Sequence, residues 1–290
     1  MWSNTETMNI DGKALSLQLK EEMRSSLSLL EKEYGRKPCL VVIIVGENPA
    51  SQSYVRGKIK AAAFVGIDSR LIELSATITQ DELLHQISLL NEDEGVDGIL
   101  VQLPLPQHID ELKVIDAIAH EKDVDGFHPL NTANLWLGKD CVFPCTPKGI
   151  ICMLQRSGIT LDGKVAVVVG RSNIVGKPIA KMLLDANATV IMAHSHTKDL
   201  PSITRQADVL VVAIGKEKFI TADMVKDGAV VVDVGINRNA DGKLCGDVDF
   251  DAVAPKASYI TPVPGGVGPM TITMLLQNTI ECFVARKKRS

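Results

Sequence analysis

The sequence predicts an α/β protein made of two three-layer α/β domains around a cleft. In two separate blocks, short apolar runs alternate with helix-like segments, which is typical of parallel sheets covered by helices. Between the blocks, the stretch from Asp125 to Lys148 is rich in Gly, Pro and Asn and has little periodicity, so the domain boundary falls near its end. The length of 290 residues suits two domains, and 46% hydrophobic residues can supply two cores.

Three strands and three helices are predicted in the first block. The first apolar run ends at Gly46-Glu47-Asn48-Pro49, and Gly66 stops the helix that follows. Thr79 and Glu82 have the spacing of a capping box, which opens the second helix. The predicted strands are Leu40–Val45, Arg70–Leu74 and Gly98–Leu103, and the helices are Ala50–Val65, a helix from Thr79 to about Leu90, and Ile109–His120.

The second block begins with a helix and continues with four apolar strands. Its predicted helices are Pro147–Arg156 and Ile174–Ala186, and its strands are Lys164–Val169, Thr189–Ala193, Val209–Ile214 and Ala229–Val234. A Gly- and Pro-rich segment precedes a last apolar helix, about Thr271–Ala285. We therefore predict a first domain of residues 1–146 and a second domain of residues 147–270, with the C-terminal helix 271–290 packing back on the first.

Composition excludes several classes of function. The net charge of −4 gives no electrostatic reason to expect nucleic acid or an anionic membrane as partner. The six cysteines form no C-x-x-C pair, which argues against a metal site or a disulfide framework and for free thiols. The N-terminus lacks the features of a signal peptide, and no apolar run is long enough to span a bilayer. These observations predict a cytoplasmic protein that binds no metal.

A glycine-bearing turn marks a candidate nucleotide site. Gly170-Arg171-Ser172-Asn173-Ile174-Val175-Gly176 lies between a predicted strand and a predicted helix. This is where a Rossmann-like dinucleotide-binding domain holds pyrophosphate on backbone N–H groups and a helix N-terminus. The spacing departs from G-x-G-x-x-G, so a structural turn that binds nothing is the alternative. The order strand, turn, helix, strand favours the nucleotide site.

The end of the next strand predicts which dinucleotide binds. NAD sites usually carry Asp or Glu there, but this chain has His194-Ser195-His196-Thr197. Hydroxyl and imidazole groups, with Arg171 in the turn, suit the 2′-phosphate of NADP. We therefore predict NADP, while His194 and His196 remain equally consistent with surface histidines.

A second group of residues indicates a chemical site in the first block. Tyr54 and Lys58 are four residues apart on a predicted helix and therefore share a face, although a helical lysine is more often a solvated surface charge. Gln102 and Leu103 end the third strand, on the side where open α/β sheets bind ligands. Asp125 lies in a turn just before the domain boundary. We expect these side chains to meet in the cleft.

A series of short motifs runs through the chain in a specific order: Val45-Gly46-Glu47-Asn48-Pro49-Ala50-Ser51, Tyr54-Val55 with Lys58, Gly98 to Pro106, Lys122-Asp123-Val124-Asp125-Gly126, Pro144-Cys145-Thr146-Pro147, Gly170-Arg171-Ser172 to Pro178, and Pro262 to Thr271. In these motifs, the sequence resembles the bifunctional methylenetetrahydrofolate dehydrogenase/cyclohydrolase family, from about Asn9 to Ala285. One departure is Ala133, where the family usually has glycine two residues after the asparagine.

The resemblance implies oxidation of 5,10-methylenetetrahydrofolate with NADP, followed by hydrolysis of the methenyl product to 10-formyltetrahydrofolate. Lys58 would be the main catalytic residue, Gln102 would hydrogen-bond it, and Tyr54 would pack against the folate rings. Asp125 would hold the pterin amide and amino edge. The implied catalytic residues are Lys58, Tyr54, Gln102 and Asp125; the substrate-binding residues are Tyr54, Leu103, Asp125, Pro262, Val263 and Gly266; the cofactor-binding residues are Thr146, Gly170, Arg171, Ser172, Ser195, Ile236 and Thr271. The resemblance also implies a homodimer.

The residue types suit this chemistry. Hydride transfer requires the positioning of two rings more than an acid or a base. A carboxylate such as Asp125 can accept two parallel N–H bonds from a pterin. The role of Lys58 as base is a hypothesis, because only a neutral amine can accept a proton.

Three other functions remain open from sequence alone. An NADP dehydrogenase for a small keto or hydroxy acid would explain the second domain, but it leaves the Tyr54, Lys58, Gln102 and Asp125 set without a role. A family member that has lost one activity is the second alternative. A non-catalytic nucleotide-sensing module is the third, and the intact Lys58 argues against it.

Overall fold

The computed structural model describes residues 7–288. Contacts divide these residues into two compact units, and the division falls inside helices α1 (Gly12–Tyr34) and α10 (Val267–Lys287). The first unit contains residues 17–145 and 272–288, and the second contains residues 7–16 and 146–271. Residues 1–6 and 289–290 lie outside the described residues. The first range is most of the N-terminal stretch that lacks the features of a signal peptide, and the second ends the predicted C-terminal helix.

The first unit is built on a three-stranded parallel sheet with the order β3-β2-β4. The central strand β2 (Cys39–Val45) is buried along its whole length because it pairs on both edges and is covered on both faces. Its neighbours are β3 (Asp68–Leu74) and β4 (Gly98–Val101). An isolated parallel bridge from Ile99 to Asp123 brings the next stretch of chain against β4.

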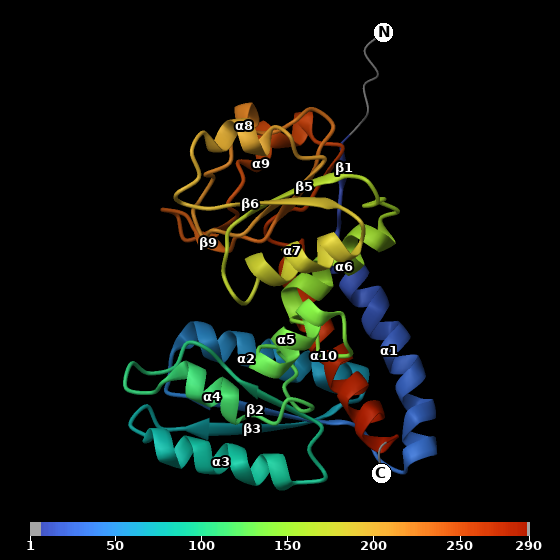
Figure 1. The fold of residues 1–290 in the computed structure, drawn as a ribbon. Coiled ribbons are helices and arrows are strands. Elements are labelled where there is room, and N and C mark those ends of the chain that lie inside the picture. The colour runs from blue at the N-terminus through green and yellow to red at the C-terminus, as the bar shows by residue number, and fades with distance from the viewer. Residues whose placement is uncertain (1–6, 289–290) are drawn as a thin grey trace. The chain divides into compact units, whose positions relative to one another are not determined.

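Helices cover both faces of this sheet. Alternate β2 residues pack with Leu83, Ile87 and Val114, so α3 and α4 cover one face, and Figure 1 shows α2 on the face opposite α3. Helix α2 begins after the N-cap Asn48 and ends at Gly66, which is left-handed with φ +98°. The helices are α2 (Pro49–Val65), α3 (Gln80–Glu92), α4 (Glu111–Ala117) and α5 (Pro129–Leu137).

The C-terminal part of α10 is anchored to the first unit by polar contacts. The side chain of Asn278 donates to the carbonyl oxygens of Val124 (2.8 Å) and Phe143 (2.9 Å). Near the end of the helix, Arg286 joins the fully buried Asp97 at 2.9 Å, and Arg36 binds the same carboxylate at 2.6 Å. Two guanidinium groups therefore neutralise Asp97 directly before β4.

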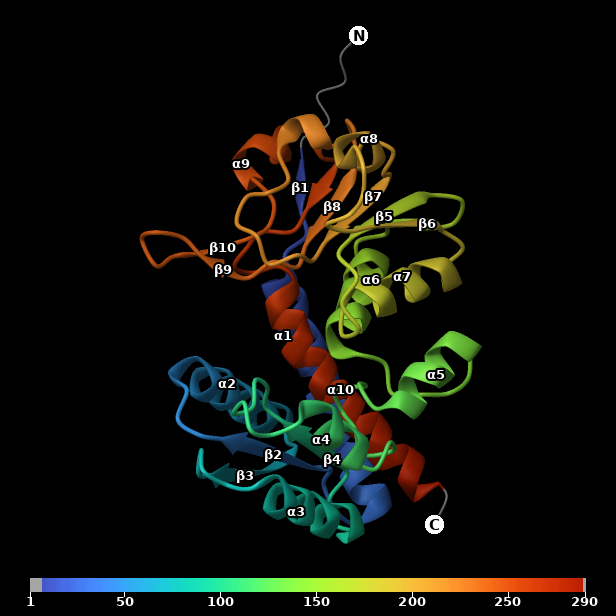
Figure 2. The same cartoon turned by 60° about the vertical axis from the view of Figure 1, so that its left-hand side comes forward.

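The second unit contains a six-stranded sheet in which every pairing is parallel (Figure 2). The chain runs outward from β5 to β6 and then returns to the other side of β5 with β7 and β8. The order in which strands are added to the sheet therefore reverses beside β5. This is the topological switch point, where open parallel sheets bind ligands. In spatial order the strands are β1 (Met8–Asn9), β11 (Tyr259–Ile260), β8 (Val230–Asp233), β7 (Val209–Val212), β5 (Val165–Val169) and β6 (Thr189–Ala193).

Short helices and one hairpin complete the second unit. A core of Val and Leu from β5, β7 and β8 packs against residues of α8, α9 and η1. Helix α7 buries Ile179 and Leu183. The elements are α6 (Cys145–Arg156), α7 (Gly176–Asp185), α8 (Leu200–Thr204), η1 (Ala222–Met224), α9 (Phe250–Val253), η2 (Ala254–Lys256), and the antiparallel pair β9 (Asn237–Arg238) and β10 (Leu244–Cys245).

The predicted fold class is confirmed, with two corrections in detail. Residues 7–16 group with the second unit rather than the first, because Met8–Asn9 pairs with Tyr259–Ile260. The stretch Asp125–Lys148, in which no helix was predicted before Pro147, contains α5, which Pro129 opens and Gly138 ends. Ala133 lies inside this helix, where alanine is favoured over glycine. Across residues 7–288, no helix combines the length and apolar character needed to cross a bilayer.

Candidate active site

Helix α2 carries the two candidate residues Tyr54 and Lys58 one turn apart. Asn48 fixes the start of the helix, because its side chain accepts hydrogen bonds from the N–H groups of Ala50 (3.0 Å) and Ser51 (3.1 Å). Tyr54 is 47% exposed, which is unusual for a large aromatic side chain, and Lys58 is half-buried. The helix therefore presents an aromatic ring and an amine on one face.

Gln102 meets Lys58 from the end of strand β4. Its backbone N–H donates to the carbonyl oxygen of Ile43 (2.8 Å), which continues the sheet pairing by one residue. Its side-chain Nε2 donates to the carbonyl oxygen of Leu103 (2.7 Å), so Oε1 faces the lysine. Lys58 Nζ donates to that Oε1 at 2.9 Å. The hydrogen bond predicted between these two side chains is present.

A rigid turn holds Asp125. The carboxylate of Asp123 accepts hydrogen bonds from the backbone N–H groups of Gly126 (3.1 Å) and His128 (2.8 Å), and from the side chain of Asn131 (3.0 Å). Gly126 has φ +73°, and an added Cβ would lie only 2.7 Å from the backbone of Phe143. The loop is thus fixed on both sides of Asp125.

Asp125 has an unusual electrostatic environment. Burial raises its pKa to about 6, although the nearby positive charge of Lys58 lowers it and the negative charge of Asp123 raises it further. Asp125 and Leu103 both line a small hollow of about 10 Å³, whose other walls are mostly apolar. The first unit therefore brings together four of the predicted residues, Lys58, Gln102, Leu103 and Asp125, and presents Tyr54 from the same helix as Lys58.

The glycine turn of the second unit fits a dinucleotide. Gly170 has φ +125°, and a Cβ there would clash with the carbonyl oxygen of Ala213. A Cβ on Gly176 would clash with the carbonyl oxygen of Gly170, so the first turn of α7 lies directly against the turn. Both positions need glycine for the backbone to approach this closely.

Backbone N–H groups in this turn are available to a ligand. The hydroxyl of Ser172 accepts from the N–H groups of Val175 and Gly176, both at 3.2 Å, and so caps the start of α7. Within residues 7–288, the N–H groups of Arg171, Ser172 and Asn173 donate to no protein acceptor. Free donors at a helix N-terminus are a setting in which pyrophosphate binds.

Arg171 and Ser195 follow neighbouring strands at the same edge of the sheet. Val169 pairs with Ala193 in register, and Gly170 N–H donates to the carbonyl oxygen of Ala193 (2.9 Å). Both Arg171 and Ser195 are exposed beyond that point. The imidazole Nδ1 of His194 accepts from the backbone N–H of His196, a local turn contact that gives neither histidine a ligand role. A cationic and a hydroxyl group without a carboxylate suit a phosphate better than a ribose diol.

The remaining predicted residues also belong to the second unit. Thr146 and Thr271 share a hydrogen bond of 3.0 Å, and Ile236, which follows β8, is 50% exposed. Pro262 and Val263 are half-buried after β11. Gly266 is buried, and a Cβ on it would lie 2.6 Å from the carbonyl oxygen of Pro262. The predicted substrate-binding set is therefore divided between the two units.

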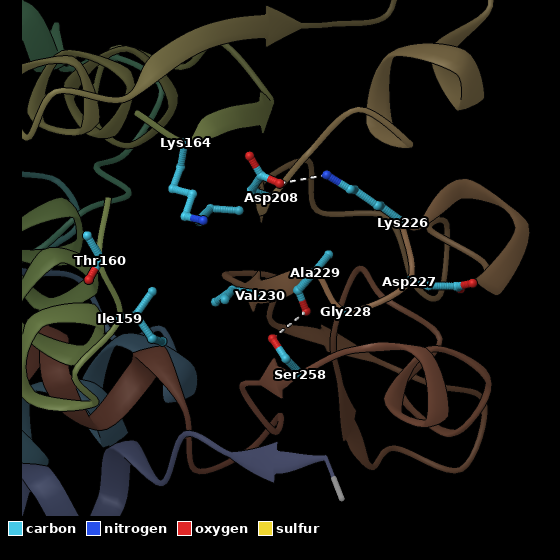
Figure 3. Close-up of a pocket in the computed structure, with 11 residues that line it drawn as sticks. Ile159, Thr160, Lys164, Asp208, Lys226, Asp227, Gly228, Ala229, Val230 and Ser258 are labelled. Carbon is cyan, nitrogen blue, oxygen red and sulfur yellow. Dashed lines mark hydrogen bonds and ion pairs between the residues drawn. The ribbon is translucent and has the colours of Figure 1, made fainter. Parts of the chain in front are cut away.

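One hollow of the second unit lies away from these residues. It has a volume of about 370 Å³ and is formed at the amino ends of β5, β7 and β8. Figure 3 shows Lys226 paired with Asp208 at its rim, at 2.6 Å, with Lys164 alongside. Because the glycine turn leaves the carboxyl end of β5, this hollow is at the opposite end of the sheet from the candidate nucleotide site.

Sequence reasoning missed two buried carboxylates, Asp233 at the end of β8 and Asp247 after β10. Both are at most 3% exposed and accept several backbone N–H groups at the carboxyl end of the sheet. A glycine lies close to each aspartate, Gly235 and Gly246, but a glycine near an aspartate does not by itself mark a buried carboxylate.

Family models match both parts of the chain. Residues 10–125 match the tetrahydrofolate dehydrogenase/cyclohydrolase catalytic domain, and residues 144–287 match the NAD(P)-binding domain of the same family. A relative from Listeria innocua, the bifunctional protein FolD, is 57% identical over 272 residues, which cover 94% of this chain and 95% of that protein.

Solved structures agree in fold and sequence. The bifunctional FolD methylenetetrahydrofolate dehydrogenase/cyclohydrolase of Campylobacter jejuni superposes with a TM-score of 0.95 at 53% identity, covering 97% of this chain and 99% of that one. The dehydrogenase-cyclohydrolase of Trypanosoma brucei, solved with NADP and an inhibitor, gives 0.92 at 40% identity, with 98% and 99% covered. The resemblance inferred from sequence is confirmed: this chain belongs to the tetrahydrofolate dehydrogenase/cyclohydrolase family.

Proposed function

We propose that this protein oxidises 5,10-methylenetetrahydrofolate to 5,10-methenyltetrahydrofolate with NADP and then hydrolyses the product to 10-formyltetrahydrofolate. Membership of the family and the match of both domain models support both activities. The observation that carries the assignment to residues is the Lys58–Gln102 hydrogen bond of 2.9 Å beside the carboxylate of Asp125.

In this proposal the first unit binds and orients the folate. The exposed ring of Tyr54 packs against the pterin, and Leu103 contributes an apolar wall beside it. The carboxylate of Asp125 accepts two N–H bonds from the pterin amide and amino edge. Pro262, Val263 and Gly266 of the second unit complete the folate contacts.

Oxidation requires only that the methylene carbon be placed against the cofactor. NADP, when bound, accepts the hydride that leaves this carbon. Gly170, Arg171, Ser172 and Ser195 hold its phosphates through backbone N–H groups, the guanidinium and hydroxyls, while Thr146, Ile236 and Thr271 contact its nicotinamide end. The residues of this chain contribute positioning, since no proton moves in the step.

Hydrolysis is the step that uses Lys58. Water adds to the carbon of the cationic methenyl bridge, and the neutral amine of Lys58 takes the proton that the water loses. Gln102 Oε1 holds Nζ in place for this transfer. The hydroxyl of the adduct then gives up its proton as the C=O bond forms, the bond from that carbon to the ring nitrogen N5 breaks, and N5 takes up a proton, which leaves the formyl group on N10 and one proton released overall.

A coupled spectroscopic assay tests both activities. Methylenetetrahydrofolate is supplied with either NADP or NAD, and reduced cofactor and methenyl product are followed together. We expect NADPH to form and the methenyl product to disappear faster than in buffer. No reduction with either cofactor, while folate still binds, would point instead to a monofunctional hydrolase or a sensing module.

We also propose that the protein acts in the cytoplasm as a homodimer without a nucleic-acid partner. The family resemblance supports the dimer, and the net charge of −4 supports the lack of nucleic-acid binding. Light scattering after size exclusion would test the dimer: a monomeric mass at micromolar concentration would refute it.

A further inference from the structure

Asp247 forms a hub between two loops of the second unit. Its carboxylate is completely buried and accepts four N–H bonds. Three come from consecutive backbone amides directly after β7, those of Ile214 (2.7 Å), Gly215 (2.9 Å) and Lys216 (2.8 Å). The fourth comes from the side chain of Asn237 (2.9 Å), in the segment after β8.

Asp233 extends this hub to a third strand end. It is 3% exposed and accepts hydrogen bonds from the N–H groups of Gly235, Asp247 and Val248, each at 2.9 Å. Its own backbone N–H donates to the hydroxyl of Thr261 (2.8 Å), directly after β11. The loops after β7 and β8 are thus connected through two carboxylates, and the backbone N–H of Asp233 adds the segment after β11.

Two glycines make room for this arrangement in a reciprocal way. A Cβ on Gly235, two residues from Asp233, would clash with the carboxylate of Asp247. A Cβ on Gly246, next to Asp247, would clash with the carboxylate of Asp233. The glycine near Asp233 thus leaves room for the side chain of Asp247, and the glycine next to Asp247 leaves room for the side chain of Asp233.

The strand order determines which part of a dinucleotide these loops meet. The pyrophosphate site is the turn after β5, and the 2′-phosphate candidates Arg171 and Ser195 lie at the ends of β5 and β6. The other half of an extended dinucleotide must then run the opposite way, across the carboxyl ends of β7 and β8. These are the strand ends that Asp247 ties together, with the exposed Ile236 between Asp233 and Asn237.

We propose that Asp247 is a positioning residue for the nicotinamide half of NADP, which it serves by fixing the loops 214–216 and 234–237. This inference rests on the proposed function, because it assumes a dinucleotide in the second unit. The reason for a carboxylate is the number of donors: two oxygens accept four N–H groups, whereas an amide of the same shape offers one oxygen and turns two donors of its own toward them. If asparagine replaced Asp247, the two loops would separate locally while the sheet beneath them stays paired.

The test uses Asp247→Asn in the full-length protein, with Asp241→Asn as control. Asp241 lies in the exposed hairpin turn of the same unit and loses the same charge. Binding of NADPH is measured by fluorescence titration, and hydrolysis is measured with methenyltetrahydrofolate and no cofactor. We expect NADPH to bind at least tenfold more weakly to the Asp247 variant, with hydrolysis within about twofold of the unsubstituted protein. The Asp241→Asn control should keep both NADPH binding and hydrolysis.

Asn237→Ala provides a milder second variant, because it removes one donor and leaves both carboxylates intact. It should weaken NADPH binding about threefold and is the decisive measurement if Asp247→Asn does not fold. Normal NADPH affinity in the folded variant would overturn the positioning role, and so would an equal loss of hydrolysis, which would indicate general unfolding. Failure of the unsubstituted protein to bind NADPH would instead overturn the proposed function.

Discussion

The two units hold their functional groups in different ways. In the first unit the candidate groups are side chains, the amine of Lys58, the amide of Gln102 and the carboxylate of Asp125, each set by a helix, a strand end or a fixed turn. In the second unit the turn after β5 offers backbone N–H groups between two closely packed glycines, and buried carboxylates hold the loops after β7 and β8. Chemistry in the first unit should therefore depend on side-chain identity, and binding in the second on backbone shape.

The largest expected effect is on hydrolysis by Lys58→Met. Methionine keeps the length and much of the packing but cannot accept a proton, so hydrolysis of methenyltetrahydrofolate should fall about 100-fold or more. Reduction of NADP, which needs no proton transfer, should fall by less than about tenfold. Lys60→Met, an exposed lysine on the same helix, is the control. Full hydrolysis by Lys58→Met would contradict the expectation that chemistry in the first unit depends on side-chain identity.

Gly170→Ala tests the backbone half of the comparison. The new Cβ clashes with the carbonyl oxygen of Ala213 at a φ of +125°, so the turn must move. We expect NADPH affinity to fall by at least about thirtyfold, with hydrolysis by the first unit kept. Gly163→Ala is a matched control, because Gly163 also has positive φ (+71°) but an added Cβ meets nothing within 4 Å.

That control should lose about 1 kcal/mol of stability and no cofactor affinity. Equal losses of NADPH affinity in the two variants would mean that backbone strain alone, rather than the closed space at Gly170, weakens the site.

Much of the fold is readable from sequence because its signals are local. The strand Thr189–Ala193 and the capping box of Thr79 and Glu82 appear as predicted. The helix α5 was missed because its start depends on the His128 side chain and Pro129, while its composition resembles a loop. Two-residue strands such as β1 carry no periodic signal, and tertiary pairing alone defines them.

The candidate site residues differ in the same way: those with a local signal in the sequence were predicted, and those without one were missed. Gln102 was identified as a candidate because it ends a strand on the side where open α/β sheets bind ligands, and its hydrogen bond to Lys58, which the family resemblance implied, is present. Asp233 and Asp247 are 14 residues apart and meet only through loop geometry, so no local pattern announces them. The side chains of the first site appear as motifs in the sequence, whereas the residues that support a backbone binding site are spread along the chain.

Arg171→Ala should have a smaller effect, confined to cofactor choice. Arg171 is exposed after the end of β5, and Ser195 follows the paired end of β6, so the guanidinium would pair with the 2′-phosphate that NAD lacks. The ratio of kcat/KM for NADP to that for NAD should fall about tenfold. Arg205→Ala removes the same charge from α8 and should leave the ratio unchanged. A ratio that stays unchanged in Arg171→Ala would show that groups other than this guanidinium select the cofactor.

The smallest expected effect is the change in stability caused by Asp125→Asn, and it depends on pH. The folded pKa of Asp125 is about 6, above the ordinary value of 3.8, so the folded protein binds more protons between these values. Stability contributed by this group is thus complete below about pH 4 and is lost as the pH rises through 6. Asparagine does not ionise, so the variant should gain stability relative to the unsubstituted protein between pH 4 and 7.5.

The gain should be on the order of 1–2 kcal/mol, below the full linkage value, because Asp125 is only half-buried and water screens its charge. Urea unfolding at pH 4 and pH 7.5, followed by the fluorescence of Trp136 in the first unit, measures it. The exposed Asp116→Asn is the control and should show no such pH dependence. A variant that gains nothing at pH 7.5 would mean that Asp125 carries no cost of burial.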